Sequence, residues 1–329
     1  MGSDRRHRSA PRMGLVLAGG GAKGAYQVGV IEYLASAGVD IRAIAGTSIG
    51  ALNGAVLASA ASLPEGAELL TAVWERVGDL TGPNPVDGPP AFDRELTGSE
   101  FDERVEQVRR FGSHVLAPGF MEELVQTSIN PNRLRSGIPI WVSAFPSALL
   151  DAAPTPVGLF IDVIRAKLGE PARWIHLNSL PTDEMYEAVL ASAALPFVLP
   201  PRHIGSERFL DGGFVDNAPA GALAAYADCD HVIVVHLQQG LLWDTERHPE
   251  LSVIEIRPTQ PLASRGMLGH MIGLLDFSPD RLAALKQQGL EDAAKILGPP
   301  LAMIDSATQL HNTRLDMINA VEDLDPPST

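Results

Sequence analysis

The chain has 329 residues, of which 45% are hydrophobic and 20% charged, and its formal net charge is −15. The length allows one large domain or two smaller ones, and the apolar fraction excludes a wholly disordered chain. The acidic balance and the low aromatic content of 5% count against a nucleic-acid partner, which attracts basic patches and stacking rings. The single cysteine, Cys229, excludes an intrachain disulfide and a cysteine-based zinc finger.

The N-terminal residues 1–12 are rich in arginine, and we expect them to form a disordered tail. No apolar signal-peptide core follows them, which favours a cytoplasmic location. Residues 43–63 are uncharged and have glycines at GxxxG spacing, but they are rich in small and polar residues. They therefore predict a buried strand and helix rather than a membrane span. We expect membrane contact to be peripheral at most.

The first elements alternate between strand and helix. Residues 14–18 form a short apolar run that ends in three glycines, and residues 27–36 follow with helical spacing. A second strand at 41–45 precedes an apolar helix at 49–60. This order predicts an α/β fold with a parallel sheet covered by helices.

The pattern is less regular in the middle and regular again near the end. A proline-rich loop is predicted at 81–91, and residues 145–171 are predicted to be an insertion around a helix at 157–168. Helical or strand patterns occupy the remaining segments. The predicted helices are 99–110, 121–128, 182–194, 219–226 and 278–297, and the predicted strands are 138–144, 208–210, 231–237 and 252–256.

The sequence Gly46-Thr47-Ser48-Ile49-Gly50 has the GxSxG pattern between a predicted strand and a predicted helix. A nucleophile elbow needs this context, because the sharp turn exposes the serine hydroxyl and the glycines allow the backbone to pack closely. The helix N-terminus also favours negative charge. Ser48 is therefore the candidate nucleophile, with a simple packing turn as the alternative.

A glycine-rich loop lies between the first strand and the first helix. Its residues, Gly19, Gly20, Gly21, Ala22, Lys23 and Gly24, fit GxGxxG, which is also the pattern of a dinucleotide site. Such a site needs an acidic residue at the end of the second strand, whereas Asp40 precedes that strand. Backbone N–H groups of the loop can instead form an oxyanion hole, with Lys23 adding positive charge.

A nucleophilic serine needs a base. None of the nine histidines lies in a recognisable motif, and we interpret His203, His231 and His236 as structural. The alternative base is Asp211, which ends a predicted strand and is followed by Gly212 and Gly213. From the residues alone, a plain Asp turn remains an equal alternative.

Together these motifs resemble those of the patatin-like phospholipases. That family combines a glycine-rich loop carrying a basic residue, a GxSxG about 25 residues later and a distant DG[GA]. Further matching segments are Ala191–Pro196 followed by Pro200-Pro201, then Asp216–Pro219 and Asp276–Pro279. The resemblance covers roughly residues 13–300 and is weak across 62–175. Lys23 stands where many members carry arginine, which makes a preference for phospholipids less secure than the ester chemistry.

The resemblance implies a three-layer α/β/α sandwich with a central, mostly parallel sheet. It implies a Ser48–Asp211 dyad without a catalytic histidine, an oxyanion hole in Gly19–Gly24, and structural glycines at Gly46, Gly50, Gly212 and Gly213. It also implies a catalytic domain at 13–300, with lid-like insertions within 62–175 and a C-terminal extension at 301–329. The implied substrate is a lipid ester, and the implied chemistry needs no cofactor or metal.

Three alternatives remain open at this level. One is an α/β-hydrolase with a Ser-His-Asp triad, one is a nucleotide-binding module with an inert Ser48, and one is a regulatory lipid-binding protein without turnover. The residues that would contact an acyl chain are also open. The predicted helix at 157–168 and the methionine-rich segment 267–275 both have apolar faces that could form a lid or pocket, or belong to the core.

Overall fold

The computed structural model describes residues 12–81, 119–147, 162, 165–194, 199–229, 231–240, 248–263 and 273–322, without the side chains of 301–322. Several sequence predictions fall outside these ranges. They are the tail up to residue 11, the helix at 99–110, most of the insertion at 145–171, and residues 267–272. The loop predicted at 81–91 lies outside them from residue 82 onward.

A mixed sheet of eight strands forms the centre of the fold, with the order β5-β6-β3-β2-β1-β7-β8 and with β4 also paired to β3. Five neighbouring strands, β3-β2-β1-β7-β8, are parallel, and β4 and β6 run antiparallel to β3. The strands are β1 (Met13–Leu17), β2 (Ile41–Thr47), β3 (Ile140–Pro146), β4 (Arg173–His176), β5 (Arg202–Ile204), β6 (Glu207–Asp211), β7 (His231–Val235) and β8 (Ser252–Ile256).

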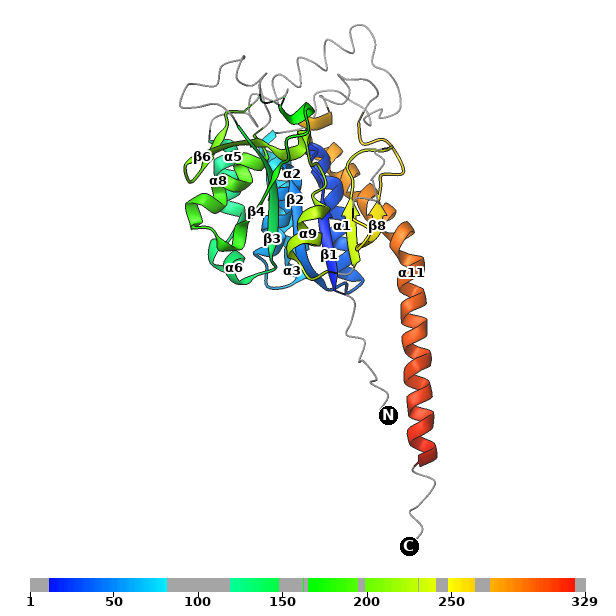
Figure 1. Cartoon of the computed structure of the whole chain (residues 1–329). Helices are drawn as coiled ribbons and strands as arrows, with labels where there is room; N and C mark the ends of the chain where they lie inside the picture. The colour runs from blue at the N-terminus through cyan, green and yellow to red at the C-terminus, as the bar shows by residue number, and fades with distance from the viewer. Residues whose placement is uncertain are drawn as a thin grey trace, which may run out of the picture.

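Helices cover both faces of this sheet, as Figure 1 shows, so the expected α/β/α layering is confirmed. Alternate residues of β1 reach opposite layers: Leu15 and Leu17 pack with the larger core cluster, and Val16 packs with the smaller one. The smaller cluster lies under α9 (Ala220–Tyr226). The larger one lies under α1 (Ala25–Ser36), α2 (Ile49–Ala58), α3 (Leu63–Thr81), α5 (Phe120–Ser128), α8 (Thr182–Ser192) and α11 (Pro279–Glu322).

The predicted strands and helices within the described ranges are confirmed to within a few residues at each end, except for the end of α11. The sequence pattern does not predict α3, α6 (Pro131–Ser136), β4 or β5. It predicts that the last helix ends at 297, before two prolines, yet α11 continues through Pro299 and Pro300 to Glu322. Its second half extends away from the sheet (Figure 1). The expected domain boundary at residue 300 lies within this helix and stays a prediction.

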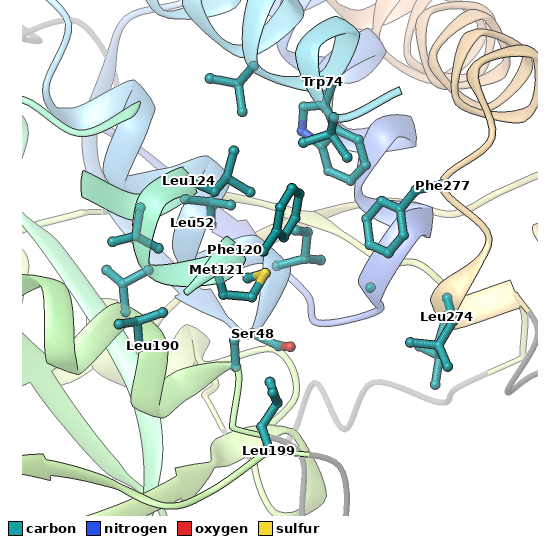
Figure 2. Close-up of a pocket in the computed structure, with 18 residues that line it drawn as sticks. Ser48, Leu52, Trp74, Phe120, Met121, Leu124, Leu190, Leu199, Leu274 and Phe277 are labelled. Atoms are coloured by element: carbon teal, nitrogen blue, oxygen red, sulfur yellow. The ribbon is translucent and has the colours of Figure 1, made fainter. Parts of the chain in front are cut away.

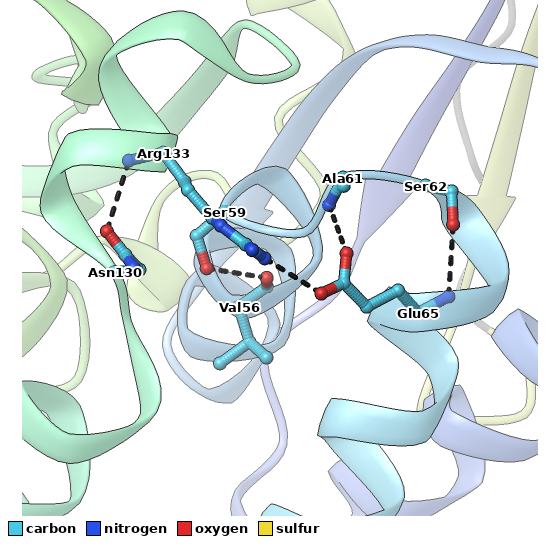
Figure 3. Close-up of polar contacts among 7 residues, drawn as sticks. All are labelled: Val56, Ser59, Ala61, Ser62, Glu65, Asn130 and Arg133. Carbon is cyan, nitrogen blue, oxygen red and sulfur yellow. Dashed lines mark hydrogen bonds and ion pairs between the residues drawn. The ribbon is translucent and has the colours of Figure 1, made fainter.

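The corner where α2, α3 and α6 meet is held by polar contacts (Figure 3). The Ser62 hydroxyl accepts a hydrogen bond from the N–H of Glu65 at 3.3 Å, which caps the start of α3. The Glu65 carboxylate accepts from the N–H of Ala61 and from Arg133, and these bonds lower its pKa. The capped corner fixes the start of α3 relative to α2, and both helices reach the candidate site described below.

Helices α1 and α11 pack with their backbones in direct contact. A Cβ at Gly29 would lie 1.9 Å from the carbonyl oxygen of Lys286, and one at Gly289 would lie 1.9 Å from that of Tyr26. The Tyr26 hydroxyl also donates to Asp292 across this contact at 3.1 Å. Glycine is therefore required on both sides of the interface. Among the helices that the structure describes, none combines the length and hydropathy needed to cross a membrane.

We expect Gly289→Ala to lower the free energy of unfolding by about 1–3 kcal/mol, because neither backbone can move away cheaply. Urea denaturation would measure the loss. Gly78→Ala in α3 is the matched control, since its Cβ would meet nothing closer than 3.4 Å. Alanine favours a helix over glycine by up to about 1 kcal/mol, so this variant should be neutral or stabilised. Equal losses in the two variants would contradict the close contact.

Candidate active site

The sharp turn predicted by GxSxG lies between β2 and α2. Ser48 has φ 55 and ψ −123, and no other described residue except glycine has a positive φ. A Cβ at Gly46 would lie 2.4 Å from the carbonyl oxygen of Gly50, and one at Gly50 would lie 2.2 Å from that of Leu17. The glycines thus allow three backbone segments to touch, and these contacts hold Ser48 in a conformation that costs on the order of 1–3 kcal/mol.

A second serine, Ser192, supports this turn through a hydrogen bond to its backbone. The Ser48 N–H donates to the Ser192 hydroxyl at 2.9 Å, and that hydroxyl donates to the carbonyl of Ser143 at 2.6 Å. Ser192 is fully buried at the end of α8. The sequence segment Ala191–Pro196 matches the family pattern, but this match gives Ser192 no role. Ser192 connects the turn to β3 and so helps to fix its position.

Asp211 ends β6 and is placed beside Ser48 by the pairing of β6 with β3, where Asp211 lies opposite Ala144. Its carboxylate accepts a hydrogen bond from the N–H of Gly213 at 2.7 Å and also hydrogen-bonds the Ser48 side chain. Burial raises the pKa of Asp211 to about 7, although both hydrogen bonds oppose the shift. The two residues selected from the sequence as nucleophile and base are therefore in contact.

The glycines after Asp211 allow close packing at the same place. A Cβ at Gly212 would lie 2.4 Å from the hydroxyl oxygen of Ser143, and one at Gly213 would lie 3.0 Å from the Asp211 carboxylate. Asp211 is buried, with an exposed fraction of 2%. Both predicted motif glycines thus lie where a side chain would displace the carboxylate or its supporting strand.

The glycine loop packs directly against Ser48. A Cβ on Gly19 would lie 3.1 Å from the Ser48 Cβ, and Gly21, at φ 56, lines the same pocket as Ser48. The N–H of Gly19 is not available to a ligand, because it donates to the Asn217 side chain at 3.1 Å. Gly20, Gly21 and Ala22 precede the first hydrogen bond of the following turn, from the N–H of Lys23 to the Gly20 carbonyl. Their N–H groups are the candidate oxyanion donors.

Lys23 and Asn217 contribute to the loop in ways that the residue pattern did not indicate. Lys23 is 1% exposed, and burial together with the nearby Arg281 lowers its pKa to about 8. Asn217 bonds Gly19 in both directions, because its amide group also donates to the Gly19 carbonyl at 3.3 Å. The only sequence signal for Asn217 is its place in the segment Asp216–Pro219, which matches the family pattern.

A buried polar network joins the glycine loop to α2 and α3. The Gln27 amide donates to the carbonyl of Ala18 at 2.7 Å, and the Asn53 amide donates to the carbonyl of Gly24 at 3.1 Å. Asn53 also donates to Gln27 at 2.9 Å and accepts from the Trp74 indole N–H at 2.9 Å. One end of the loop is thereby fastened to Gln27 of α1 and the other to Asn53 of α2, which suits a site whose N–H groups must keep fixed directions.

An apolar pocket opens beside Ser48, as Figure 2 shows. Its volume is about 70 Å³, and its walls come from α2, α3, α5, α8 and the segment around Leu274. Of the two segments expected to contact an acyl chain, 267–275 contributes Leu274 and Leu275 to this lining. In the described part of 157–168, Leu168 is 82% exposed and does not line it.

No described histidine lines this pocket. His203 accepts a hydrogen bond from Arg208. His236 lies 2.9 Å from Glu255. His270 lies outside the described residues, four positions before Leu274. The described residues also contain no cluster of three or more side chains suited to a metal ion.

The position of Asp40 argues against a dinucleotide site at the glycine loop. Asp40 precedes β2, and β1 and β2 are parallel with Met13 opposite Ile41. Asp40 therefore lies at the end of the sheet opposite the glycine loop, which follows Leu17. A ribose bound near the loop would be out of its reach, since five residues of strand span about 16 Å.

We expect Asp211→Asn to stabilise the protein at neutral and higher pH. Because the pKa of Asp211 is raised from 3.8 to about 7 in the folded state, the folded protein keeps a proton that the unfolded chain has lost between those values. Stability from this group is present at low pH and falls as pH rises through that range, by on the order of a few kcal/mol. Asparagine removes the effect and can keep both hydrogen bonds.

Thermal unfolding of both proteins at pH 4 and pH 8 measures this difference. The variant should match the wild type at pH 4 and have the higher Tm at pH 8. A difference in Tm that is the same at both pH values would mean that ionisation of the carboxyl is not its cause.

Comparison with known proteins shows which family the chain resembles. A family model described as patatin-like phospholipase matches residues 15–224. An uncharacterized NTE family protein of Mycobacterium tuberculosis is 27% identical over 241 residues, which cover 72% of this chain and 32% of that protein. The lysophospholipase nte1 of Aspergillus terreus is 45% identical over 89 residues, covering 23% and 6%. The chain thus aligns with a third or less of the length of these relatives.

Among solved structures, VipD from Legionella pneumophila superposes with a TM-score of 0.45 at 14% identity, covering 88% of this chain and 67% of that one. The family match, in contrast, extends over more than half of the chain and includes the glycine loop, the GxSxG turn and Asp211. The chain belongs to the patatin-like phospholipase family.

Proposed function

We propose that this chain is a serine acyl hydrolase that cleaves lipid esters through a Ser48–Asp211 dyad. One observation carries the proposal: the hydroxyl of a strained serine meets a buried carboxylate at the mouth of an apolar pocket. A packing turn has no need of a positive φ at serine, nor of an ionisable group that is destabilised by burial. Strain and a perturbed pKa at one place are typical of catalytic sites.

In the proposed reaction the Ser48 Oγ attacks the ester carbonyl carbon while Asp211 takes the hydroxyl proton. The tetrahedral oxyanion is bound by N–H groups of Gly20, Gly21 and Ala22. On collapse, Asp211 gives this proton to the leaving alcohol or lysolipid, and an acyl group stays on Ser48. Asp211 then takes a proton from the water that attacks this acyl-enzyme and returns it to Ser48 Oγ as the fatty acid leaves. Loss of one oxyanion donor typically costs about 3 kcal/mol in the barrier, so the direction of these N–H groups matters nearly as much as the dyad.

The apolar pocket supports a lipid as the acyl donor, because apolar side chains from several helices line it next to the nucleophile. The name lysophospholipase, carried by a relative that shares part of this chain, fits an ester of this class. The net charge of −15 opposes lasting contact with an anionic bilayer. A monomeric or micellar lysophospholipid is therefore the substrate that we propose to test first.

Labelling with a fluorophosphonate probe tests the nucleophile. We expect the wild-type chain to form an adduct at Ser48, identified by peptide mass spectrometry, and Ser48→Ala to form none. Ser143→Ala, a change in a buried serine of the same neighbourhood, serves as the control and should keep the adduct. An unlabelled but folded wild-type protein would contradict the hydrolase and favour a regulatory lipid-binding protein.

The dyad is tested by comparing Asp211→Asn with His270→Ala. Asp211→Asn should lower kcat for a p-nitrophenyl ester by a factor of about 100 or more, because the base contributes at least this much to the rate. His270→Ala should retain turnover within about twofold. Loss of turnover in His270→Ala would replace the dyad with a Ser-His-Asp triad, since that histidine is close in sequence to the pocket.

The pH dependence of turnover should follow the Asp211 carboxyl. Its pKa is raised to about 7 by burial, and only the ionised form can accept the proton of Ser48. We expect kcat/KM for p-nitrophenyl butyrate to rise with pH through a single midpoint near 7 and then to level off. The reaction is followed at the isosbestic wavelength of p-nitrophenol. A midpoint near the ordinary value for aspartate, about 4, would contradict the assigned base.

A further inference from the structure

Trp74 lines both the pocket beside Ser48 and a second cavity. This second cavity has a volume of about 540 Å³ and lies between α1, α3 and α11, where its lining includes charged residues such as Glu32, Asp79 and Lys286. Among the described residues, Trp74 is the only one that lines both cavities. An apolar, narrow pocket and a larger, polar cleft thus meet at one side chain.

Trp74 is held in place by contacts on several sides. It is 5% exposed, its indole N–H donates to the Asn53 Oδ1 at 2.9 Å, and its ring lies 6.1 Å from that of Phe277 at an interplanar angle of 21°. Asn53 cannot follow a moving indole, because its amide group is bound to Gly24 and Gln27. Rotation of Trp74 would leave the buried Asn53 oxygen without this donor, and such a loss is unfavourable.

Ser48 and Trp74 lie a short distance apart along the pocket. Ser48 precedes α2 and Leu52 lines the pocket one turn later, beside Asn53, which binds the indole. Five residues of helix correspond to about 7–8 Å along its axis. In Figure 2, Trp74 lies at the top of the view and Ser48 lies below it, with Phe120 and Met121 between them. An extended acyl chain bound to Ser48 would reach the indole within this span.

We propose that Trp74 is the specificity-determining residue that closes the acyl pocket and limits the length of the acyl chain. This inference rests on the proposed hydrolase activity. It implies that the preferred substrates carry short or medium acyl chains, because a longer chain has no path past the indole. It also implies that removal of the indole connects the pocket to the second cavity, whose volume then accommodates the distal part of a long chain.

The test compares p-nitrophenyl butyrate, octanoate and palmitate at one fixed detergent concentration. The wild type should hydrolyse butyrate and octanoate with a higher kcat/KM than palmitate. Trp74→Ala should raise the ratio of kcat/KM for palmitate to that for butyrate about tenfold or more, mainly through a lower KM for palmitate. Trp74→Phe keeps most of the ring but loses the bond to Asn53, so it should change the ratio by no more than about threefold.

Leu282→Ala is the matched control, because Leu282 is buried and lines the second cavity but not the pocket beside Ser48. It enlarges the cleft and leaves the indole in place, so the ratio should stay within about twofold of the wild type. Circular dichroism and Tm establish that each variant is folded. If Trp74→Ala is unfolded, Trp74→Leu takes its place with the same expected result.

Two results would overturn the inference: an unchanged ratio in a folded Trp74→Ala or Trp74→Leu, or a wild type that prefers palmitate to octanoate. The second comparison needs no variant and therefore decides the matter even if no Trp74 variant folds. Failure of the proposed function has a different signature, in which the wild type hydrolyses none of the three esters and takes up no fluorophosphonate.

Discussion

The site depends on one backbone constraint, the positive φ of Ser48 between β2 and α2. This conformation is unfavourable for a residue with a side chain, and it persists because Gly46 and Gly50 allow the carbonyls of Gly50 and Leu17 to come within contact distance. The turn directs the hydroxyl toward Asp211 and leaves the start of α2 next to the glycine loop. A side chain at Gly46 or Gly50 would force these backbone segments apart and so displace both the Ser48 hydroxyl and the start of α2.

The second constraint is the polar network that fastens the loop to its surroundings. Gln27, Asn53 and Trp74 are buried, and each satisfies a polar group that would otherwise be costly inside the core. The same three residues connect the candidate oxyanion donors to the wall of the apolar pocket. The groups that would bind the charged part of a transition state and those that would bind its acyl chain therefore belong to one rigid unit.

Sequence periodicity predicted the first four elements well because each is strongly apolar, and a glycine follows the first three of them within two residues. It missed α3, where Pro64 and Gly66 weaken the helical pattern although Glu65 and Ser62 cap the start. It missed β4 and β5, which have four and three residues and are too short to show alternation. It ended α11 at two prolines, a strong local signal that the observed helix overrides. Ser48 and Asp211 could be selected from the sequence because their glycines make local motifs, and their catalytic roles stay a prediction.

By itself the sequence determined the α/β class, the glycine loop, the turn at Ser48 and the candidate base, since each is written in residues that are adjacent in the chain. Only the tertiary structure decided which groups meet across long separations. Ser192 and Asn217 reach the turn and the loop from distant segments, and burial alone raises the pKa of Asp211. Trp74 closes a pocket that no linear pattern marks, because its partners Asn53 and Phe277 are brought to it by packing.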